Sequence, residues 1–281
     1  MKPVRSLRLI PFLAVALALP AESNAKAQQA PPLAGIAHVA IRVRDLAASI
    51  AFYQSLGFEQ AFDLRHGDTP YESFIKINDH QFLELYPVSD KDPKAGFLHV
   101  CFESNDLEEL HEDYISHGLM PIPVQKAGAG NLLFTMPGPL QPIGPDGKAI
   151  PQNIEYTQYM PGSLHSKDAG QHLGSDRIGD RLLGVSLAML DPEAARNFYI
   201  NQLSFKPLPG EQMVLHPPGN SGEEVHIVSA SQGMRARITL QTSSLFRTSR
   251  RLSRAHIKAQ KSEETLSFVD PDGNQISVQL R

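Results

Sequence analysis

The chain of 281 residues has no tryptophan and only one cysteine, Cys101. A single cysteine excludes an internal disulfide and a zinc cluster built from cysteines, so any metal ion must be bound by histidine and carboxylate side chains. Neither sign of charge dominates, because the formal net charge is −4. A surface that binds phosphate backbones would normally make the chain strongly basic, so nucleic acid is not expected as a partner.

The N-terminal apolar run is too short for a membrane span. Residues 9–19 provide only 11 positions, interrupted by Pro11, whereas a spanning helix needs about 20. Basic residues precede this run, and Ala25-Lys26-Ala27 follows it as an A-x-A cleavage site. This is the form of a secretory signal peptide. We therefore expect residues 1–27 to be removed, which leaves a secreted or periplasmic protein without a stable membrane anchor; a retained anchor is the alternative.

An internal repeat is the main organisational feature of the remaining sequence. An apolar strand pattern at 37–43 leads to Asp45, which is positioned to cap a helix. A second strand pattern, at 183–189, leads to Asp191 in the same way. Each aspartate precedes a Phe-Tyr pair by seven positions. The length allows two domains, and the repeat indicates that both begin with the same strand–helix unit.

Each copy continues with short strand patterns and then with another strand and helix. In the first half we expect strands at 73–77 and 81–86, a new strand at 97–102, a helix near 106–117, and strands at 131–136 and 153–159. The order βαβββ is thus given twice, and it recurs less clearly in the second half. We expect an α+β fold of four such modules, with a linker at 28–34, domains at 35–160 and 183–281, and a linker at 161–182.

The residues at fixed places in this pattern resemble a known superfamily. The similar segments are His38-Val-Ala-Ile-Arg-Val-Arg-Asp-Leu46, Ala51-Phe-Tyr-Gln-Ser-Leu-Gly-Phe58, Phe82-Leu-Glu-Leu85, Leu98-His-Val100 and Asn153-Ile-Glu-Tyr156. Together they resemble the vicinal oxygen chelate (VOC) superfamily of glyoxalase I, bleomycin resistance proteins and extradiol dioxygenases. The resemblance is strong in 35–160 and weaker in 183–281, where Asp270-Pro-Asp-Gly-Asn274 is the best landmark. It implies paired modules whose sheets curl around a cup, with a metal ion on its floor.

Four residues at matching module positions are the candidate metal ligands. His38 and His99 lie on the first strands of modules one and two, and Glu84 and Glu155 lie on the last strands. Two imidazoles and two carboxylates suit one divalent ion such as iron, nickel, cobalt, manganese or zinc. The alternative for each residue alone is ordinary: a hydrogen-bonded strand histidine, or a solvent-facing glutamate.

The number of ligands separates the chemistries. Four ligands leave an octahedral ion two open positions, which favours glyoxalase-like isomerase or lyase chemistry on a small substrate chelated through two neighbouring oxygens. The resemblance then implies Glu155 as the catalytic base, with Glu84 as second choice. If Glu84 stays off the metal, His38, His99 and Glu155 form the facial triad of Fe(II) dioxygenases. A non-catalytic binding or resistance protein is the third interpretation, and an enzyme is the favoured one.

Arg42 is the candidate substrate-binding residue. It lies four positions after His38, so strand alternation places both on the same face. The resemblance to glyoxalase I implies contact with an anionic substrate, and an ion pair with a nearby carboxylate is the alternative. No other element of a glutathione site is matched, so glyoxalase I activity itself is not expected.

The second half has lost the ligand set. Aligning the halves places Gly184, His226, Ile238 and Ser277 where the first half has His38, Glu84, His99 and Glu155. One possible ligand cannot hold an ion, so residues 183–281 indicate a metal-free copy used for packing, for covering the cup, or for contact in a homodimer.

Three further segments carry weaker signals. His165 and His172 in the polar linker are interpreted as lid or proton-transfer groups, or as solvated loop residues. The proline-rich segment 138–152 indicates either a substrate gate or a passive loop. The basic stretch 247–261 is typical of a solvated helix face.

Overall fold

The computed structural model describes residues 31–143, 148–219, 222–230 and 236–280. The expected signal peptide, residues 1–27, lies outside these ranges. In the described part of the chain, no helix combines the length and the apolar character that crossing a membrane requires.

The first half of the described chain forms one eight-stranded sheet. Module one contains β1 (Leu33–Val43), α1 (Leu46–Ser55), β2 (Glu59–His66), β3 (Thr69–Lys76) and β4 (Phe82–Pro87). Module two contains β5 (Gly96–Ser104), α2 (Leu107–Ser116), β6 (Gln125–Lys126), β7 (Leu132–Ile143) and β8 (Lys148–Gln158). The strand order is β2-β3-β4-β1-β5-β8-β7-β6. The first strands β1 and β5 pair antiparallel at the centre, and each pairs in parallel with the last strand of its own module.

The second half repeats this arrangement after a short helix, α3 (Leu164–Lys167), in the connecting segment. Its elements are β9 (Arg181–Met189), α4 (Pro192–Asn201), β10 (Lys206–Leu208), β11 (Glu211–His216), β12 (Glu224–Ser229), β13 (Arg237–Thr242), α5 (Leu245–Arg254), β14 (Gln260–Lys261), β15 (Thr265–Val269) and β16 (Gln275–Leu280). The order β10-β11-β12-β9-β13-β16-β15-β14 matches the first sheet strand for strand. The expected α+β fold of four βαβββ modules in two domains is confirmed.

Local chemistry explains where the helices begin and end. The side chains of Asp45, Asp106 and Asp191 each accept a hydrogen bond from the backbone amide three residues later, as an N-cap does. Gly57 and Gly118 follow the first two helices with φ values of 89° and 79°. A residue with a side chain is strained in this left-handed conformation, so glycine ends both helices.

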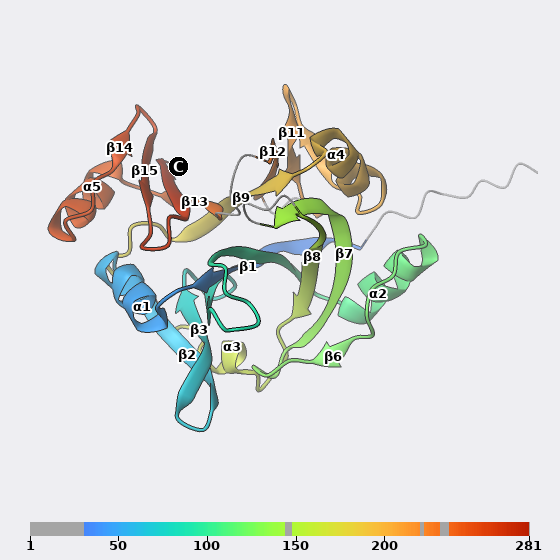
Figure 1. Cartoon of the computed structure of the whole chain (residues 1–281), viewed down its shortest axis with the longest axis horizontal. Helices are drawn as coiled ribbons and strands as arrows, with labels where there is room; N and C mark the ends of the chain where they lie inside the picture. Colours follow the sequence, from blue (N-terminus) through green and yellow to red (C-terminus); the bar gives the residue numbers. More distant parts are fainter. Residues whose placement is uncertain (1–30, 144–147, 220–221, 231–235, 281) are drawn as a thin grey trace, which may run out of the picture.

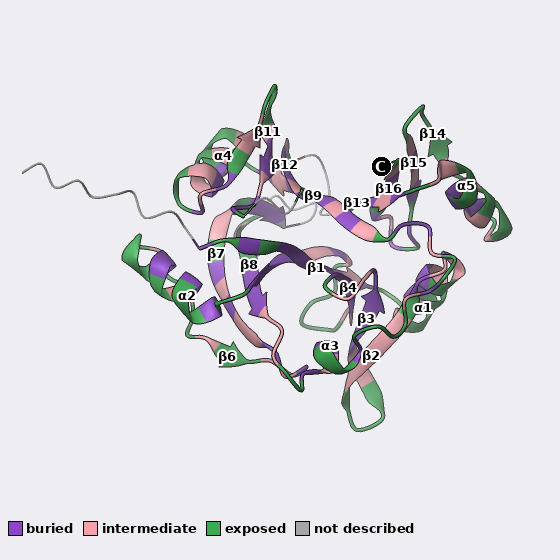
Figure 2. Ribbon diagram, turned by 180° about the vertical axis from the view of Figure 1, so that it is seen from behind, coloured by how far each residue is buried: buried purple, intermediate pink, exposed green. Residues whose placement is uncertain are grey.

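The first sheet curls into a cup with α1 and α2 on its outer side (Figure 1). Alternate residues of the central strands point outward and pack on the helices, among them Val39, Leu83, Val100 and Ile154, all fully or almost fully buried. Figure 2 shows this burial along the strands and on the helix faces that meet them. The residues between them therefore face into the cup.

The proline-rich segment 138–152 is not a loop in its described parts. Strands β7 and β8 continue to pair through it, with Leu140 opposite Pro151 and Gln141 opposite Ile150, beyond a bulge between Pro137 and Leu140. This arm contacts the second half of the chain. Leu190 donates its backbone N–H to Leu140 over 3.1 Å. The loop interpretation is wrong for these residues, because the strands continue to pair and the arm contacts the second domain. The gate interpretation stays a prediction.

The landmark at 270–274 also serves the contact between the domains. Asp270 accepts hydrogen bonds from the backbone amides of Asp272 and Asn274 and so closes a tight turn. From that turn, Asp270 accepts a 3.1 Å hydrogen bond from the hydroxyl of Tyr53 on α1. Asp272 forms a 2.9 Å ion pair with Arg44. Buried carboxylates thus hold the second domain against the first.

Candidate metal centre

The four expected ligands lie on four adjacent strands in the middle of the first sheet. His38 on β1 is opposite Cys101 on β5, which in turn is opposite Glu155 on β8. Glu84 on β4 is opposite Ala40, two residues after His38. All four alternate with outward-facing core residues, so the cup floor brings them together. They are buried, with exposed fractions between 2% and 9%.

Three of the four side chains converge closely. Nε2 of His38 lies 3.0 Å from Nε2 of His99. One carboxylate oxygen of Glu155 lies 3.4 Å from Nε2 of His38, and the other lies 3.7 Å from Nε2 of His99. Two ligand atoms at right angles and about 2.1 Å from one ion are about 3.0 Å apart. The spacing of the three groups therefore fits neighbouring positions around a single divalent ion.

Glu84 approaches from another side. Its Oε1 lies 3.0 Å from Nδ1 of His38, the ring nitrogen remote from Glu155, and its Oε2 lies 3.9 Å from Nε2 of His99. The hydroxyl of Tyr86 donates a 3.2 Å hydrogen bond to Oε2. Glu84 thus lies within ion-pair distance of Nδ1 of His38, although this nitrogen has no hydrogen-bond partner of suitable geometry among the described residues. His38, Glu84 and His99 also qualify as a ligand group, because one atom of each lies within 4.8 Å of the others.

Protonation states favour a cation at this point. Burial lowers the pKa of His38 to about 3 and that of His99 to about 4, so both imidazoles are neutral and available as ligands at neutral pH. Burial raises the pKa of Glu155 and of Glu84 above their ordinary values. Among the described residues, no arginine or lysine forms an ion pair with either glutamate. A divalent ion would supply the missing positive charge, so the donor set fits the group.

Glu72 on β3 is a third buried carboxyl group that the sequence interpretation missed. Burial raises its pKa to about 7, hydrogen bonds with Tyr86 and Glu84 lower it, and the charge of Glu155 raises it. Its position follows from register. Phe74 is opposite Glu84, so Glu72, two residues earlier, shares the cup face. The alternation of side chains between the two faces of β3 was the feature of the sequence from which the position of Glu72 could have been predicted.

Cys101 and Arg42 also border the centre. Cys101 belongs to a possible ligand group with His38 and Glu155. Burial raises the pKa of its thiol well above the ordinary value, so the sulfur stays protonated and is a weak ligand. Arg42 lies close enough to lower the pKa of His99, and it pairs with the carboxylate of Asp92 at 3.5 Å. Arg42 therefore lies beside the centre with its charge partly compensated.

His165 on α3 lies inside the cup. It is 3% exposed, and neither ring nitrogen has a hydrogen-bond partner among the described residues. Its ring stacks on Tyr159 at 4.3 Å and meets three phenylalanines edge-on, namely Phe62, Phe74 and Phe82, at centroid distances of 5.1, 5.4 and 5.0 Å. Burial, with a contribution from His38, lowers its pKa to about 3. A neutral imidazole thus lies in an aromatic box beside the ligands.

The connecting segment is held over the cup by a buried lysine. Lys76 is fully buried, and its Nζ donates to the backbone oxygen and the carboxylate of Asp168 over 2.6 and 2.7 Å. His172 is exposed and pairs with Asp168. Of the two linker histidines, therefore, only His165 faces the candidate centre.

Replacing His165 by phenylalanine is expected to stabilise the fold. The substitution removes two unpaired polar atoms from an apolar site and leaves a planar ring among aromatic neighbours, so the free energy of unfolding should rise by about 1 kcal/mol. Urea denaturation measures it. His66→Phe is the matched control, since His66 stacks on Tyr71 at the same 4.3 Å but is exposed. A clear loss of stability in His165→Phe would show that the imidazole has a polar partner.

The second sheet has no equivalent centre in its described residues. Gly184, His226 and Ser277 occupy the expected positions, but Ile238 points into the core. Arg237 is opposite Ser186 as His99 is opposite Ala40, so Arg237 is the true counterpart of His99. Strand pairing corrects the sequence alignment by one residue, and a slip of one residue exchanges the two faces of a strand.

Comparison with known proteins supports the resemblance seen in the sequence. Residues 35–147 match the model of the Glyoxalase/Bleomycin resistance protein/Dioxygenase superfamily. The match covers most of the first domain and none of the second. The match includes three of the four candidate ligands, while Glu155 lies beyond its end. No curated protein sequence matches the chain.

Solved structures share the fold over nearly the whole chain. The 2,3-dioxygenase LapB from Pseudomonas sp. KL28 is 14% identical, with a TM-score of 0.63 over 90% of this chain and 93% of that one. The Mn(II)-bound glyoxalase from Novosphingobium aromaticivorans is 16% identical, with a TM-score of 0.64 over 89% and 82%. Homoprotocatechuate 2,3-dioxygenase from Brevibacterium fuscum is 16% identical, with a TM-score of 0.63 over 91% and 82%. The likeness of fold to these structures thus extends across both domains.

Proposed function

We propose that this chain is a metal-dependent enzyme that acts on a small substrate chelated through two neighbouring oxygens. The observation that carries the proposal is the buried approach of three groups, the Nε2 atoms of His38 and His99 at 3.0 Å and the carboxylate of Glu155 within 3.7 Å of both. Neutral imidazoles with one carboxylate make an open site for a divalent ion. The signal-peptide form of residues 1–27 supports action outside the cytoplasm, which N-terminal sequencing of the mature protein would check.

Ring-cleaving oxygenation is the chemistry that the position of Glu84 favours. Because Oε1 of Glu84 lies beside Nδ1 of His38 rather than Nε2, we assign His38, His99 and Glu155 as the ligand set in this proposal. Two histidines and one carboxylate leave an octahedral ion three open positions, enough for a chelating substrate and dioxygen, and this set is typical of non-haem Fe(II) oxygenases. When bound, the ion would supply a Lewis acid and a redox centre. Several of the solved structures with this fold are extradiol dioxygenases.

Glyoxalase-like isomerase or lyase chemistry is the second candidate. It is favoured by the ligand group of His38, Glu84 and His99 and by the shared fold of a glyoxalase. With Glu84 as fourth ligand, two open positions remain, and a carboxylate would remove a proton from the carbon next to a carbonyl group. The raised pKa of Glu155 suits a base that holds and returns a proton.

Other cup residues have roles under either chemistry. Tyr86 orients Glu84 through a hydrogen bond, and Glu84 lies 3.0 Å from Nδ1 of His38, where a small rotation of the carboxylate would let it accept from the ring. His165 is neutral, and its free nitrogens can donate to or accept from a substrate atom. The segment bearing it, fixed by Lys76 and Asp168, would keep water away from the centre.

Two variants separate the chemistries. Glu155→Gln should weaken metal binding far more than Glu84→Gln if Glu84 only orients His38, since loss of such a partner costs about 10- to 100-fold in affinity. Isothermal titration with Fe(II) under nitrogen and with Mn(II) measures both. Oxygen consumption on catechols, set against an isomerase screen on α-hydroxy and α-keto acids, then tests the reaction.

The metal affinities of the two variants distinguish the two ligand sets. Equal losses in Glu84→Gln and Glu155→Gln, together with isomerase activity, would overturn the dioxygenase proposal in favour of the four-ligand enzyme. A parent protein that binds a catechol or a keto acid without converting it, with no metal bound, would make the chain a binding protein.

A further inference from the structure

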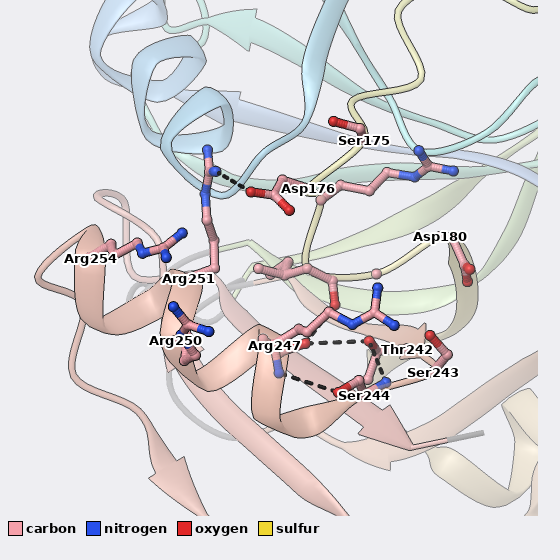
Figure 3. Close-up of a pocket in the computed structure, with 14 residues that line it drawn as sticks. Ser175, Asp176, Asp180, Thr242, Ser243, Ser244, Arg247, Arg250, Arg251 and Arg254 are labelled. Atoms are coloured by element: carbon pink, nitrogen blue, oxygen red, sulfur yellow. Dashed lines mark hydrogen bonds and ion pairs between the residues drawn. The ribbon is translucent and has the colours of Figure 1, made fainter.

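A cavity rich in arginine lies apart from the metal centre, where the connection between the domains passes α5 (Figure 3). It has a volume of about 350 Å³, and its wall is formed by residues 175–180, residues 242–244 and the side chains of α5. Pockets of this size at a contact between domains are typical places for small ligands. The basic stretch expected to be a solvated helix face therefore borders a hollow.

The charge around this cavity opposes that of the chain. Five arginines line it, Arg177, Arg247, Arg250, Arg251 and Arg254, against two aspartates, Asp176 and Asp180, which gives a formal balance of +3. The whole chain carries −4. A concentration of one sign in a concave site raises the local potential and attracts anions.

One of these arginines has a structural role. Arg251 donates to the backbone oxygens of Ser55 and Gln54 at the end of α1, over 2.7 and 3.2 Å, and lies 3.5 Å from the carboxylate of Asp176. It therefore joins α5 to the first domain and to the connecting segment. Figure 3 shows its ion pair with Asp176 at the edge of the cavity.

Other arginines have N–H groups without a hydrogen-bond acceptor. In the part of the chain that the structure describes, the guanidinium groups of Arg247 and Arg254 have neither a hydrogen-bond acceptor nor an ion-pair partner. Nε of Arg177 is buried without a partner, although another nitrogen of this group donates to Leu173 and Gly174. A buried, unpaired N–H group costs free energy unless something accepts from it.

The start of α5 adds to the positive potential. Ser244 caps the helix by accepting from the backbone amide of Arg247, and both residues line the cavity. The positive end of the helix dipole is therefore near the same space, where it favours an anion within about the first turn. The N-terminal end of α5 and the unpaired guanidinium groups therefore border the same cavity.

We propose that this cavity binds a compact polyanion carrying phosphate or carboxylate groups. Guanidinium groups match both oxyanions through paired hydrogen bonds, and the balance of +3 calls for a ligand with more than one negative charge. The bound anion would bridge residues 175–180 and α5, and so would stabilise the contact between the domains. The proposal does not depend on the chemistry of the metal centre.

Isothermal titration of the full chain with pyrophosphate, and separately with citrate, at low ionic strength tests the proposal and separates the two sources of negative charge. Binding should weaken at least about tenfold in Arg247→Gln/Arg254→Gln and should fall with added salt. Arg196→Gln is the control, because Arg196 is a half-buried arginine on α4 outside the cavity. His99→Ala excludes chelation of both probes by metal at the other site.

The supporting result is binding of at least one probe that His99→Ala and Arg196→Gln retain and the double variant loses. Two results would overturn the proposal: no binding of either probe by the parent chain, or equal binding by the parent and the double variant. The side chains of Arg247 and Arg254 are exposed, and circular dichroism of each variant verifies that it is folded.

Discussion

Replacing His99 by alanine is expected to abolish stoichiometric binding of a divalent metal ion. The parent chain should bind about one ion, because the Nε2 atoms of His38 and His99 face the same carboxylate in a buried site. Removing one imidazole leaves too few ligands, and affinity should fall by at least about 100-fold, the upper range for losing even a supporting contact. Elemental analysis of the dialysed protein and titration with Zn(II) or Mn(II) measure the loss.

A matched control distinguishes loss of a ligand from general damage. His226 lies in the second sheet at the position that Glu84 has in the first, and it pairs with Glu224 at 2.9 Å. The variant His226→Ala should therefore bind metal like the parent. A parent chain without metal affinity, or a His99→Ala variant with unchanged affinity, would refute the metal centre.

The second large effect is a fall in the stability that the buried carboxyl groups contribute to the metal-free protein as the pH rises above 6.5. Burial raises the pKa of Glu72 to about 7, from 4.5, and raises that of Glu84 further. The folded chain therefore holds protons that the unfolded chain releases, and a rising pH favours unfolding. Glu72 alone should lower the free energy of unfolding by about 1 kcal/mol between pH 6.5 and 8.5, with Glu84 adding to this fall.

The histidines act in the opposite sense at lower pH. The pKa values of His38 and His99 fall from 6.5 to about 3 and about 4 on folding. Their contribution to stability is therefore fully present above pH 6.5 and is lost as the pH falls toward those values. At pH 6.5 the unfolded imidazoles are still half protonated, so the histidines raise the free energy of unfolding somewhat between pH 6.5 and 8.5. Only the difference between the parent and a carboxyl variant therefore isolates the carboxyl groups.

Bound metal should reverse the trend, since deprotonated carboxylates bind it better at high pH. At a free concentration of 100 times Kd, it adds about 2.7 kcal/mol to the stability. Urea unfolding of the chelator-treated and metal-loaded chain at pH 6.5 and 8.5 measures both effects. Glu72→Gln should remove a fall of about 1 kcal/mol from the metal-free profile between pH 6.5 and 8.5, since its side chain does not titrate. Parent and Glu72→Gln profiles with the same slope would contradict the buried acidic cluster.

The fold and the ligand types follow from local patterns in the sequence. Asp45 and Asp191 cap helices because their side chains accept from backbone amides close by in the chain. Alternation along β1 and β5 separates His38 and His99 from the core residues beside them. Because each module repeats the same local pattern, four modules could be counted from the sequence.

Details that depend on strand register were not predictable in the same way. Ile238 was aligned with His99, but the pairing of β9 with β13 places Arg237 opposite Ser186, so Arg237 takes that position. The prolines of 138–152 indicated a loop, yet the strands continue to pair around a bulge. A bulge changes which side chain faces the cup and leaves no clear mark in the sequence.

The sequence by itself determined the modular α+β fold, the superfamily resemblance and a set of nitrogen and oxygen ligands without cysteine thiolate. Only the tertiary structure decided that Glu84 lies beside the remote nitrogen of His38, that Glu72 joins the cluster, that His165 enters the cup from the connecting segment, and that five arginines surround one cavity. The physical reason is that these contacts join strands and segments far apart in the chain. Their geometry is fixed by sheet curvature, by bulges and by packing between the domains, which no local pattern specifies.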